Sequence, residues 1–331
     1  MDMVQEYAEN LFTDRTDAFV QPNEGLVNLQ MDIMELNPSL SNKIDFMAYL
    51  EKLIDDFEEL KQLLPSKFEE YKQKFDDLLA PSFLSTIIEC RNTRLPEDRA
   101  ERAALPVRRA KFYEEIVDRI RYEEARPVMA SYMEKLGIQT CVYCNNAEAV
   151  YSDKDEEAYY HFDHWKPKDK YPFLSICFYN LYPSCSICNG HKLDGRKGSF
   201  QLYTEDEPAK DPFVFYVDRS EYIARQPNTL SVSFKSRESR NDIYCEEYNK
   251  VYRIKEFYNS PGGLRQVSKL ITDIDKHRGS YIDATNSSIP DIVDKDVLFH
   301  DVLGVDGDEA NIFTDIKKKL KLDTAKDAKL L

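Results

Sequence analysis

Cys141-Val-Tyr-Cys144 and Cys185-Ser-Ile-Cys188 are two Cys-x-x-Cys pairs that stand 40 residues apart in the chain. Two thiolates at this spacing can bind one metal ion from a tight turn, and two such turns complete the tetrahedral four-sulfur site of structural zinc. We therefore predict that these four cysteines bind one Zn²⁺ ion. The residues between the pairs then form a hairpin-sized insert whose ends the metal holds together, and zinc supplies part of the folding free energy.

The insert and the second cysteine pair carry polar residues suited to phosphate chemistry. The strings are His161-Phe-Asp163-His164-Trp-Lys-Pro and Cys188-Asn189-Gly-His191-Lys192. The Asp163 carboxylate and the Asn189 amide offer oxygen ligands that suit Mg²⁺ or Mn²⁺ rather than zinc. His164 is an imidazole that can take a proton from water near pH 7. With Lys192 placed to meet a phosphate, this set of side chains predicts phosphodiester hydrolysis.

The array CxxC…DH…N-L-x-x-x-CxxC-N-x-x-K, over about residues 141–197, resembles the HNH endonucleases, the ββα-metal nucleases with a structural four-cysteine zinc. The resemblance implies that Asp163 and Asn189 bind the catalytic Mg²⁺ or Mn²⁺ and that His164 is the general base. It also implies that Asn180 lies near His164 and fixes its orientation. Cleavage by such a site leaves a 5′ phosphate and a 3′ hydroxyl.

Further residues around this array have expected roles in binding. His161 is an extra histidine that could assist the catalytic metal, and four side chains are expected to contact the substrate phosphates: Lys166, Lys168, His191 and Lys192. The string Asp163-His164-Trp-Lys-Pro-Lys, with a later Lys170-Tyr-Pro, is similar to the HNH component of Septu-type bacterial antiphage systems, which works beside an ATPase. That similarity implies a role in antiviral defence and an ATPase partner.

Three other functions are alternatives to a DNA-cleaving nuclease. A zinc-dependent nucleobase deaminase needs His-x-Glu and three zinc ligands, whereas the chain has His161-Phe-Asp163 and four cysteines, so we reject it. A non-catalytic zinc module that binds nucleic acid or protein has no need of the acid, the imidazole and the amides. An RNA-cleaving HNH enzyme remains open, because nothing in the sequence indicates recognition of the 2′-hydroxyl, and DNA is the expected substrate.

The charge balance limits how the chain meets nucleic acid. It has 45 basic and 60 acidic residues, a net charge of −15, and an acidic surface repels phosphate. Residues 164–200, however, contain six basic and two acidic residues, and residues 91–111 contain seven and three. We predict that these two basic stretches form a nucleic-acid track, that the chain binds weakly alone, and that a partner delivers substrate.

Composition also indicates the class of protein. Hydrophobic residues make up 42% of the 331 residues, enough for a core, which excludes wholesale disorder. No run approaches the about 18 consecutive apolar residues of a membrane helix, and the N-terminus lacks the pattern of a secretion signal. We expect a soluble, cytoplasmic protein. Outside the two pairs, Cys90, Cys177 and Cys245 are expected to be small core residues.

The expected fold class is α+β: a mainly α-helical protein with an embedded zinc-stapled ββα-metal nuclease module. Three segments are predicted: an α-helical domain at 1–138, the nuclease module at 139–200, and a mixed α/β C-terminal region with a basic tail at 201–331.

Periodicity predicts the individual elements. Apolar residues three or four apart, from Ile44 to Leu64, predict one helix over 42–64. Ser66 is expected to cap a second helix that ends before Pro81, and a third runs from Val107 until Pro127. Strands are predicted at 150–151 and 159–162 around a polar turn and at 230–234, with a helix at 264–274. Residues 314–331 predict a frayed amphipathic tail.

Overall fold

The computed structural model describes residues 3–13, 20–91, 105–152, 154–155, 157–192, 201–204, 213–218, 230–236, 242–286, 299–305 and 311–328. The chain divides into two compact units. The first unit consists of Met1–Lys135, Tyr151–Ala158 and Phe162–Tyr182, and the second of Leu136–Val150, Tyr159–His161 and Pro183–Leu331. Each unit is therefore built from segments distant in sequence. The division into domains at 1–138, 139–200 and 201–331 stays a prediction.

The first unit is mainly helical, with two small antiparallel hairpins. Its α-helices are α1 (Met3–Asn10), α2 (Pro22–Leu36), α3 (Lys43–Asp55), α4 (Phe57–Leu60), α5 (Phe68–Asp76), α7 (Phe112–Arg119) and α8 (Tyr122–Lys135). Its short 3₁₀ helices are η1 (Pro65–Lys67), η2 (Pro81–Ser85), η3 (Pro172–Leu174) and η4 (Phe178–Asn180). The hairpins pair β1 (Ile87–Arg91) with β2 (Val107–Lys111), and β3 (Tyr151–Ser152) with β4 (Glu157–Ala158).

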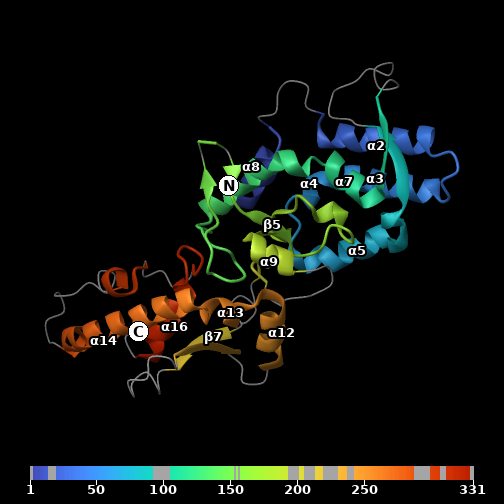
Figure 1. Cartoon of the computed structure of the whole chain (residues 1–331). Helices are drawn as coiled ribbons and strands as arrows, with labels where there is room; N and C mark the ends of the chain where they lie inside the picture. The colour runs from blue at the N-terminus through green and yellow to red at the C-terminus, as the bar shows by residue number, and fades with distance from the viewer. Residues whose placement is uncertain are drawn as a thin grey trace. The chain divides into compact units, whose positions relative to one another are not determined.

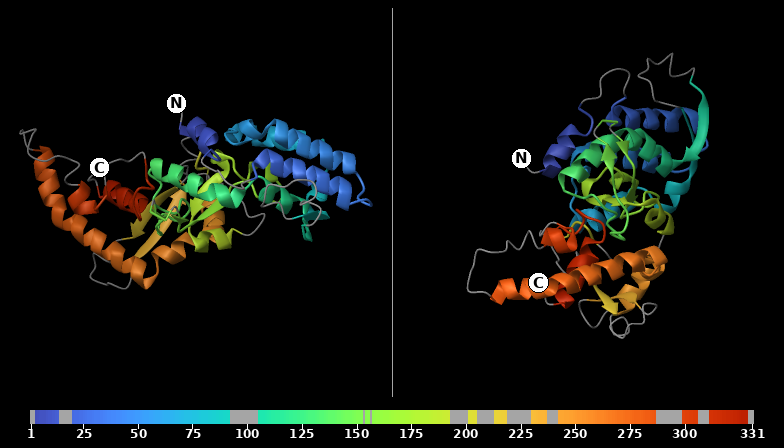
Figure 2. Two further views of the ribbon diagram at one scale, coloured as in Figure 1. Left: turned by 90° about the horizontal axis from the view of Figure 1, so that it is seen from above. Right: turned by 60° about the vertical axis from the view of Figure 1, so that its left-hand side comes forward.

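Aromatic side chains make up much of the core of the first unit. Helices α2 and α3 lie side by side (Figures 1 and 2). Phe46 of α3 meets Phe112 of α7 edge to face, with ring centroids 4.7 Å apart. Phe75 of α5 stacks on Phe173 of η3 at 4.4 Å. Such pairs add to the free energy gained from burial, so the loop that contains η3 is held firmly on the helices.

The helix predicted over 42–64 is two helices, α3 and α4, because the chain leaves helical geometry at Asp56. Leu50 and Leu53 of the predicted apolar stripe are buried, but Ile44 is 82% exposed. Ile44 lies two residues before Phe46, which is about 200° around a helix, and therefore on the solvent side.

Three further predictions for this region are wrong. Val107–Lys111 is a strand paired with β1, whereas a helix was predicted to begin at Val107. Ser66 lies inside η1, and Lys67 is the residue that precedes α5. Pro127 is the sixth residue of α8 and does not end it, although a proline at this position removes one backbone hydrogen bond of the helix.

A strand, a second strand and a helix follow one another around the second cysteine pair. β5 (His161–His164) and β6 (Leu181–Ser184) form a two-stranded sheet, and α9 (Ser186–His191) starts directly after Cys185. The hairpin predicted at 150–151 and 159–162 is present with different bounds. Its paired strands are β3 and β4, a backbone hydrogen bond of 2.9 Å from Tyr159 to Val150 extends it, and residues 161–162 belong to β5.

The second unit is mixed. It contains α9, the antiparallel strands β7 (Phe213–Asp218) and β8 (Ser231–Ser236), the helices α12 (Asp242–Tyr252), α13 (Ile254–Tyr258), α14 (Pro261–Asn286) and α16 (Lys318–Asp327), and a π-helical turn, η6 (Phe299–Leu303). The predicted strand at 230–234 and helix at 264–274 are confirmed by β8 and α14. A Cβ on Gly263 would lie 2.5 Å from the Tyr258 carbonyl oxygen, so glycine lets α14 begin close to α13.

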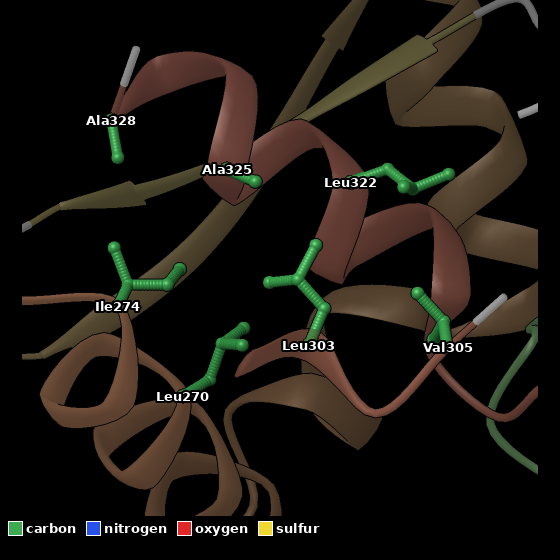
Figure 3. Packing of buried hydrophobic residues seen from close by; sticks show 7 residues of the cluster. All are labelled: Leu270, Ile274, Leu303, Val305, Leu322, Ala325 and Ala328. Carbon is green, nitrogen blue, oxygen red and sulfur yellow. The ribbon is translucent and has the colours of Figure 1, made fainter. Parts of the chain in front are cut away.

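One apolar cluster joins α14, η6 and α16 (Figure 3). Leu270 and Ile274 of α14 face Leu303 and the buried side of α16. In Figure 1, α16 also lies beside β7. The cluster consists of Leu270, Ile274, Leu303, Val305, Leu322, Ala325 and Ala328.

The expected frayed tail is wrong, because α16 is docked in the second unit. Lys318 and Lys319 are 0% and 4% exposed. The Lys318 ammonium donates to Thr314 Oγ1 at 2.9 Å, and the Lys319 ammonium lies 3.2 Å from the Asp323 carboxylate. Buried ammonium groups need such partners. The sequence of three lysines does not show which residues will provide them.

Among the described residues, no helix is both long enough and apolar enough to span a membrane.

Candidate metal centre and catalytic residues

The four cysteines of the two pairs form one cluster in the second unit. Their Sγ atoms all lie within 4.8 Å of one another. A tetrahedral zinc site with bonds of about 2.3 Å places sulfur atoms about 3.8 Å apart, so the cluster could hold a zinc ion after small adjustments. Its donors are all sulfur, which favours zinc over magnesium. The predicted grouping of Cys141, Cys144, Cys185 and Cys188 is confirmed.

The electrostatics of the cluster call for a cation. Hydrogen bonds from the other three thiols lower the pKa of Cys185, whereas hydrogen bonding to those thiols raises the pKa of Cys188. Several thiolates in one buried place repel one another. A divalent ion would stabilise all four thiolates together.

Asn145, directly after Cys144, connects the first cysteine pair to the C-terminal segment 311–328. It adopts the left-handed backbone conformation, with φ of 47°. Its Nδ2 donates to the carbonyl oxygens of Ile312 and Asp315, each at 3.0 Å, and its Oδ1 accepts from the Lys319 amide at 3.2 Å. One side chain therefore organises the turn that precedes α16.

Two buried tyrosines hold the same cysteine turn from the other elements of the second unit. The Tyr248 hydroxyl of α12 donates to the Tyr143 carbonyl at 2.6 Å, and the Tyr258 hydroxyl of α13 donates to the Cys144 carbonyl at 2.9 Å. The cysteine cluster is therefore central to the second unit. The sequence does not reveal these contacts, since nothing around positions 248 and 258 points to residue 144.

Asp163 and His164 end strand β5 in the first unit and are 9% and 6% exposed. The His164 Nε2 lies 2.9 Å from the Ser175 carbonyl oxygen. A carbonyl oxygen only accepts hydrogen bonds, so Nε2 carries the proton and Nδ1 carries the lone pair of the neutral ring. His164 is thus held in a tautomer whose Nδ1 can take a proton.

Asn180 fixes the chain that follows His164. Its Oδ1 accepts from the Lys166 amide at 2.7 Å, and its Nδ2 donates to the carbonyl oxygens of Lys166 and Leu174, each at 3.1 Å. Its own carbonyl accepts from the Trp165 amide at 3.0 Å. Asn180 is fully buried, so these bonds hold residues 165–174 in one conformation.

The two lysines that follow His164 differ in their surroundings. The Lys166 ammonium forms an ion pair with Glu69 and lies 4.7 Å from the centre of the Trp165 ring. The Lys168 ammonium lies 4.5 Å over the Tyr122 ring. Burial is the largest influence on Lys168 and lowers its pKa, because the ammonium has lost water. Binding of a phosphate would replace that lost solvation.

The remaining predicted site residues lie in the second unit. Asn189 is half-buried in α9, and its backbone amide donates to the Cys185 carbonyl oxygen at 3.0 Å. The Lys192 ammonium lies 5.9 Å from the Tyr143 ring centre, and His161 is exposed. The Nδ1 atom of His191 is buried without a hydrogen-bond partner among the described residues. That Asn189 joins Asp163 at one metal ion stays a prediction.

The predicted basic track is partly neutralised within the first unit. Arg91 donates to Asp32 at 2.8 Å and to Glu35 at 2.9 Å. Arg108 lies 2.8 Å from both Glu115 and Asp118. Arg109 is exposed on β2. The arginines at 94, 99 and 102 and the cations at 196 and 197 fall outside the described residues, so the track stays a prediction.

Comparisons with known proteins point to one bacterial relative. Over 93 residues the chain is 33% identical to the Septu protein PtuB of Bacillus thuringiensis, a match that covers 27% of this chain and 34% of the relative. The chain thus spans about a third of the length of that relative. No family model matches, and no solved structure gives a significant match.

Proposed function

We propose that the chain is a metal-dependent nuclease of the HNH type, with His164 as its general base. The observation that carries the proposal is the hydrogen bond of 2.9 Å from His164 Nε2 to the Ser175 carbonyl oxygen. Asp163 is the residue before His164 in the sequence. The hydrogen bond leaves Nδ1 as the proton acceptor, and the carboxylate of Asp163 is a hard ligand of the kind that Mg²⁺ and Mn²⁺ prefer.

The other roles follow from the chemistry of each residue. Asp163 and Asn189 would bind the Mg²⁺ or Mn²⁺ ion, with His161 as an additional ligand. When bound, that ion would offset the negative charge that develops on the phosphate during cleavage. His164 Nδ1 would take the proton of the attacking water, while Asn180 holds the chain after His164. Contacts to substrate phosphates are assigned to Lys166, Lys168, His191 and Lys192.

Two features support this assignment. The order of β5, β6 and α9 is the strand–strand–helix order expected for a ββα-metal module. The four-cysteine cluster is the kind of zinc site that stabilises such a module in the HNH nucleases that contain structural zinc. Similarity to a Septu protein supports a second part of the proposal, that the chain acts in antiphage defence beside an ATPase.

Nicking of supercoiled plasmid in the presence of Mg²⁺ or Mn²⁺ tests the nuclease. We expect the wild-type chain to nick DNA and His164→Ala to lose cleavage, with zinc content and circular dichroism unchanged. His300→Ala is the matched control, because His300 is 81% exposed and lies in the second unit. Full activity of His164→Ala would remove this residue from the mechanism.

The same assay separates the two alternatives. A non-catalytic zinc module predicts binding of nucleic acid without metal-dependent nicking, in the wild type as in His164→Ala. An RNA-cleaving enzyme predicts cleavage of a labelled single-stranded RNA but not of the DNA of the same sequence, with the same dependence on His164.

A further inference from the structure

The Tyr122 ring lies against two of the residues assigned to the site. Its centroid is 5.0 Å from that of the His164 imidazole, with the two planes tilted by 55°. The Lys168 ammonium lies 4.5 Å from the same ring centroid. Tyr122 itself is only 5% exposed. All three residues belong to the first unit, and nothing in the sequence around Tyr122 suggested a part in the site.

The backbone before Tyr122 is held in an unusual conformation. Arg121 has a φ of 63°, in the left-handed region that residues with side chains rarely adopt. Its amide donates to the Asp118 carbonyl at 3.1 Å, and its carbonyl accepts from the Ala125 amide at 3.0 Å. α7 and α8 therefore meet in a tight turn that sets the direction in which the Tyr122 ring leaves the backbone. Strain of this kind is often found beside functional sites.

The hydrogen bond to Ser175 fixes the position of the His164 Nε2 atom. The tilt of the imidazole about that atom depends also on what is packed against the face of the ring. A ring packed against the imidazole at 5.0 Å restricts the tilt, and so restricts the direction of the Nδ1 lone pair. Proton transfer depends strongly on this direction.

The ring also accounts for the position of Lys168. An ammonium over an aromatic face is attracted by the electrons of the ring, which compensates part of the cost of burial. Glu123 favours the charged form of Lys168 and Arg126 opposes it, both from the first turns of α8. Lys168 is thus held in a poorly hydrated place, where an anion would improve its surroundings.

We propose that Tyr122 is a positioning residue that sets both the imidazole of His164 and the ammonium of Lys168, so that Lys168 meets the phosphate beside the base. This inference rests on the proposed nuclease function. It adds to that function an aromatic residue from α8, about 40 positions before the base in the sequence. The aromatic ring is the part required, and the hydroxyl is not.

The test compares Tyr122→Phe with Tyr122→Leu. The chain has five histidines, so selective ¹³C labelling of histidine gives five imidazole signals, and the one lost in His164→Ala belongs to His164. We expect Tyr122→Phe to keep that signal in place and to keep kcat within about twofold. Tyr122→Leu should shift the signal, because the ring current is lost, and should lower kcat by about 10- to 100-fold.

Lys168→Gln tests the second part without altering the ring. We expect KM for a plasmid substrate to rise by about tenfold, with kcat within about twofold and the His164 signal in place. An unchanged KM would overturn the role of Lys168. If Tyr122→Leu does not fold, Tyr122→Met takes its place, since a flexible thioether fills irregular space well.

The outcomes separate this inference from the proposed function. A His164 signal and a kcat that both stay unchanged in Tyr122→Leu would overturn the positioning role. If the wild-type chain cleaves no nucleic acid, the nuclease proposal fails by itself, and the imidazole signal still decides whether Tyr122 holds His164.

Discussion

His164 and Lys168 are single residues whose neighbours change what their side chains can do. The Ser175 carbonyl selects the tautomer of His164, and burial lowers the pKa of Lys168. Neither effect follows from residue type. In water, a neutral histidine has two available tautomers, and a lysine has its ordinary pKa. The chemistry assigned to the site therefore depends on these contacts.

Lys168→Met should stabilise the protein at pH 7, and the gain should shrink as the pH rises. Burial lowers the pKa of Lys168 in the folded state, so the unfolded state binds this proton more tightly. The free energy of unfolding of the wild type then increases with pH between the lowered pKa and the ordinary value of about 10.5. Methionine has no proton to lose, so the difference between the two proteins falls across this window.

Urea unfolding of both proteins at pH 7 and pH 10 measures this difference. The exposed Lys170, two residues away, provides the control, and Lys170→Met should leave the free energy of unfolding unchanged at both values. A stabilisation by Lys168→Met that is equal at pH 7 and pH 10 would contradict the prediction.

The turn of the first cysteine pair is the element on which the second unit depends. Hydroxyl groups from α12 and α13 bind its carbonyl oxygens, and Asn145 binds the segment before α16. A metal ion that closes the cluster would therefore also stabilise elements that contribute no ligand.

Cys185→Ser should lose the zinc ion and most of the helical signal of the second unit. Serine is a poor zinc ligand, and three thiolates without the fourth bind the metal much more weakly. Zinc analysis and circular dichroism of the purified protein measure both effects. Cys90→Ala is the matched control, since Cys90 is a buried cysteine of the first unit that takes no part in the cluster; loss of zinc in that variant too would argue against the assignment.

Asn145→Ala should loosen residues 311–328 while the four cysteines remain. It removes the bonds to Ile312, Asp315 and Lys319, at a cost of about 1–3 kcal/mol. Hydrogen exchange followed by mass spectrometry should show faster exchange in peptides from this segment. Asn42→Ala is the control, because Asn42 has the same left-handed backbone, with φ of 61°, but belongs to the first unit. Equal exchange in both variants would show that Asn145 does not hold the segment.

The distribution of charge concerns the molecule as a whole. The net charge is −15, and Arg91 and Arg108 are paired with carboxylates. Fewer cations are then available for phosphate than the basic stretches of the sequence imply. This agrees with the proposal that another protein brings the substrate.

The purified chain should therefore bind a DNA duplex weakly at physiological salt. Fluorescence anisotropy of a labelled duplex, measured at rising salt with and without proteins recovered together with the chain from native cells, tests this. We expect affinity to increase when the recovered partner is added. Tight binding and processive cleavage by the chain alone at physiological salt would rule out the need for a partner.

Short-range patterns were enough for part of this structure. Two Cys-x-x-Cys pairs predicted the sulfur cluster correctly, because metal binding depends on ligand type and on spacing within a turn. Alternating apolar residues predicted β8, and the three- or four-residue repeat predicted α14, because each pattern reflects one buried face. Cys90, Cys177 and Cys245 are buried, as expected.

Other features depend on partners that lie far away in the chain. Val107–Lys111 became a strand by pairing with β1, and the lysines at 318 and 319 became buried because Thr314 and Asp323 bind them. The contact of Tyr122 with His164 joins residues more than 40 positions apart. Local pattern carries no information on such contacts, since their free energy arises only when the packed elements bring the groups together.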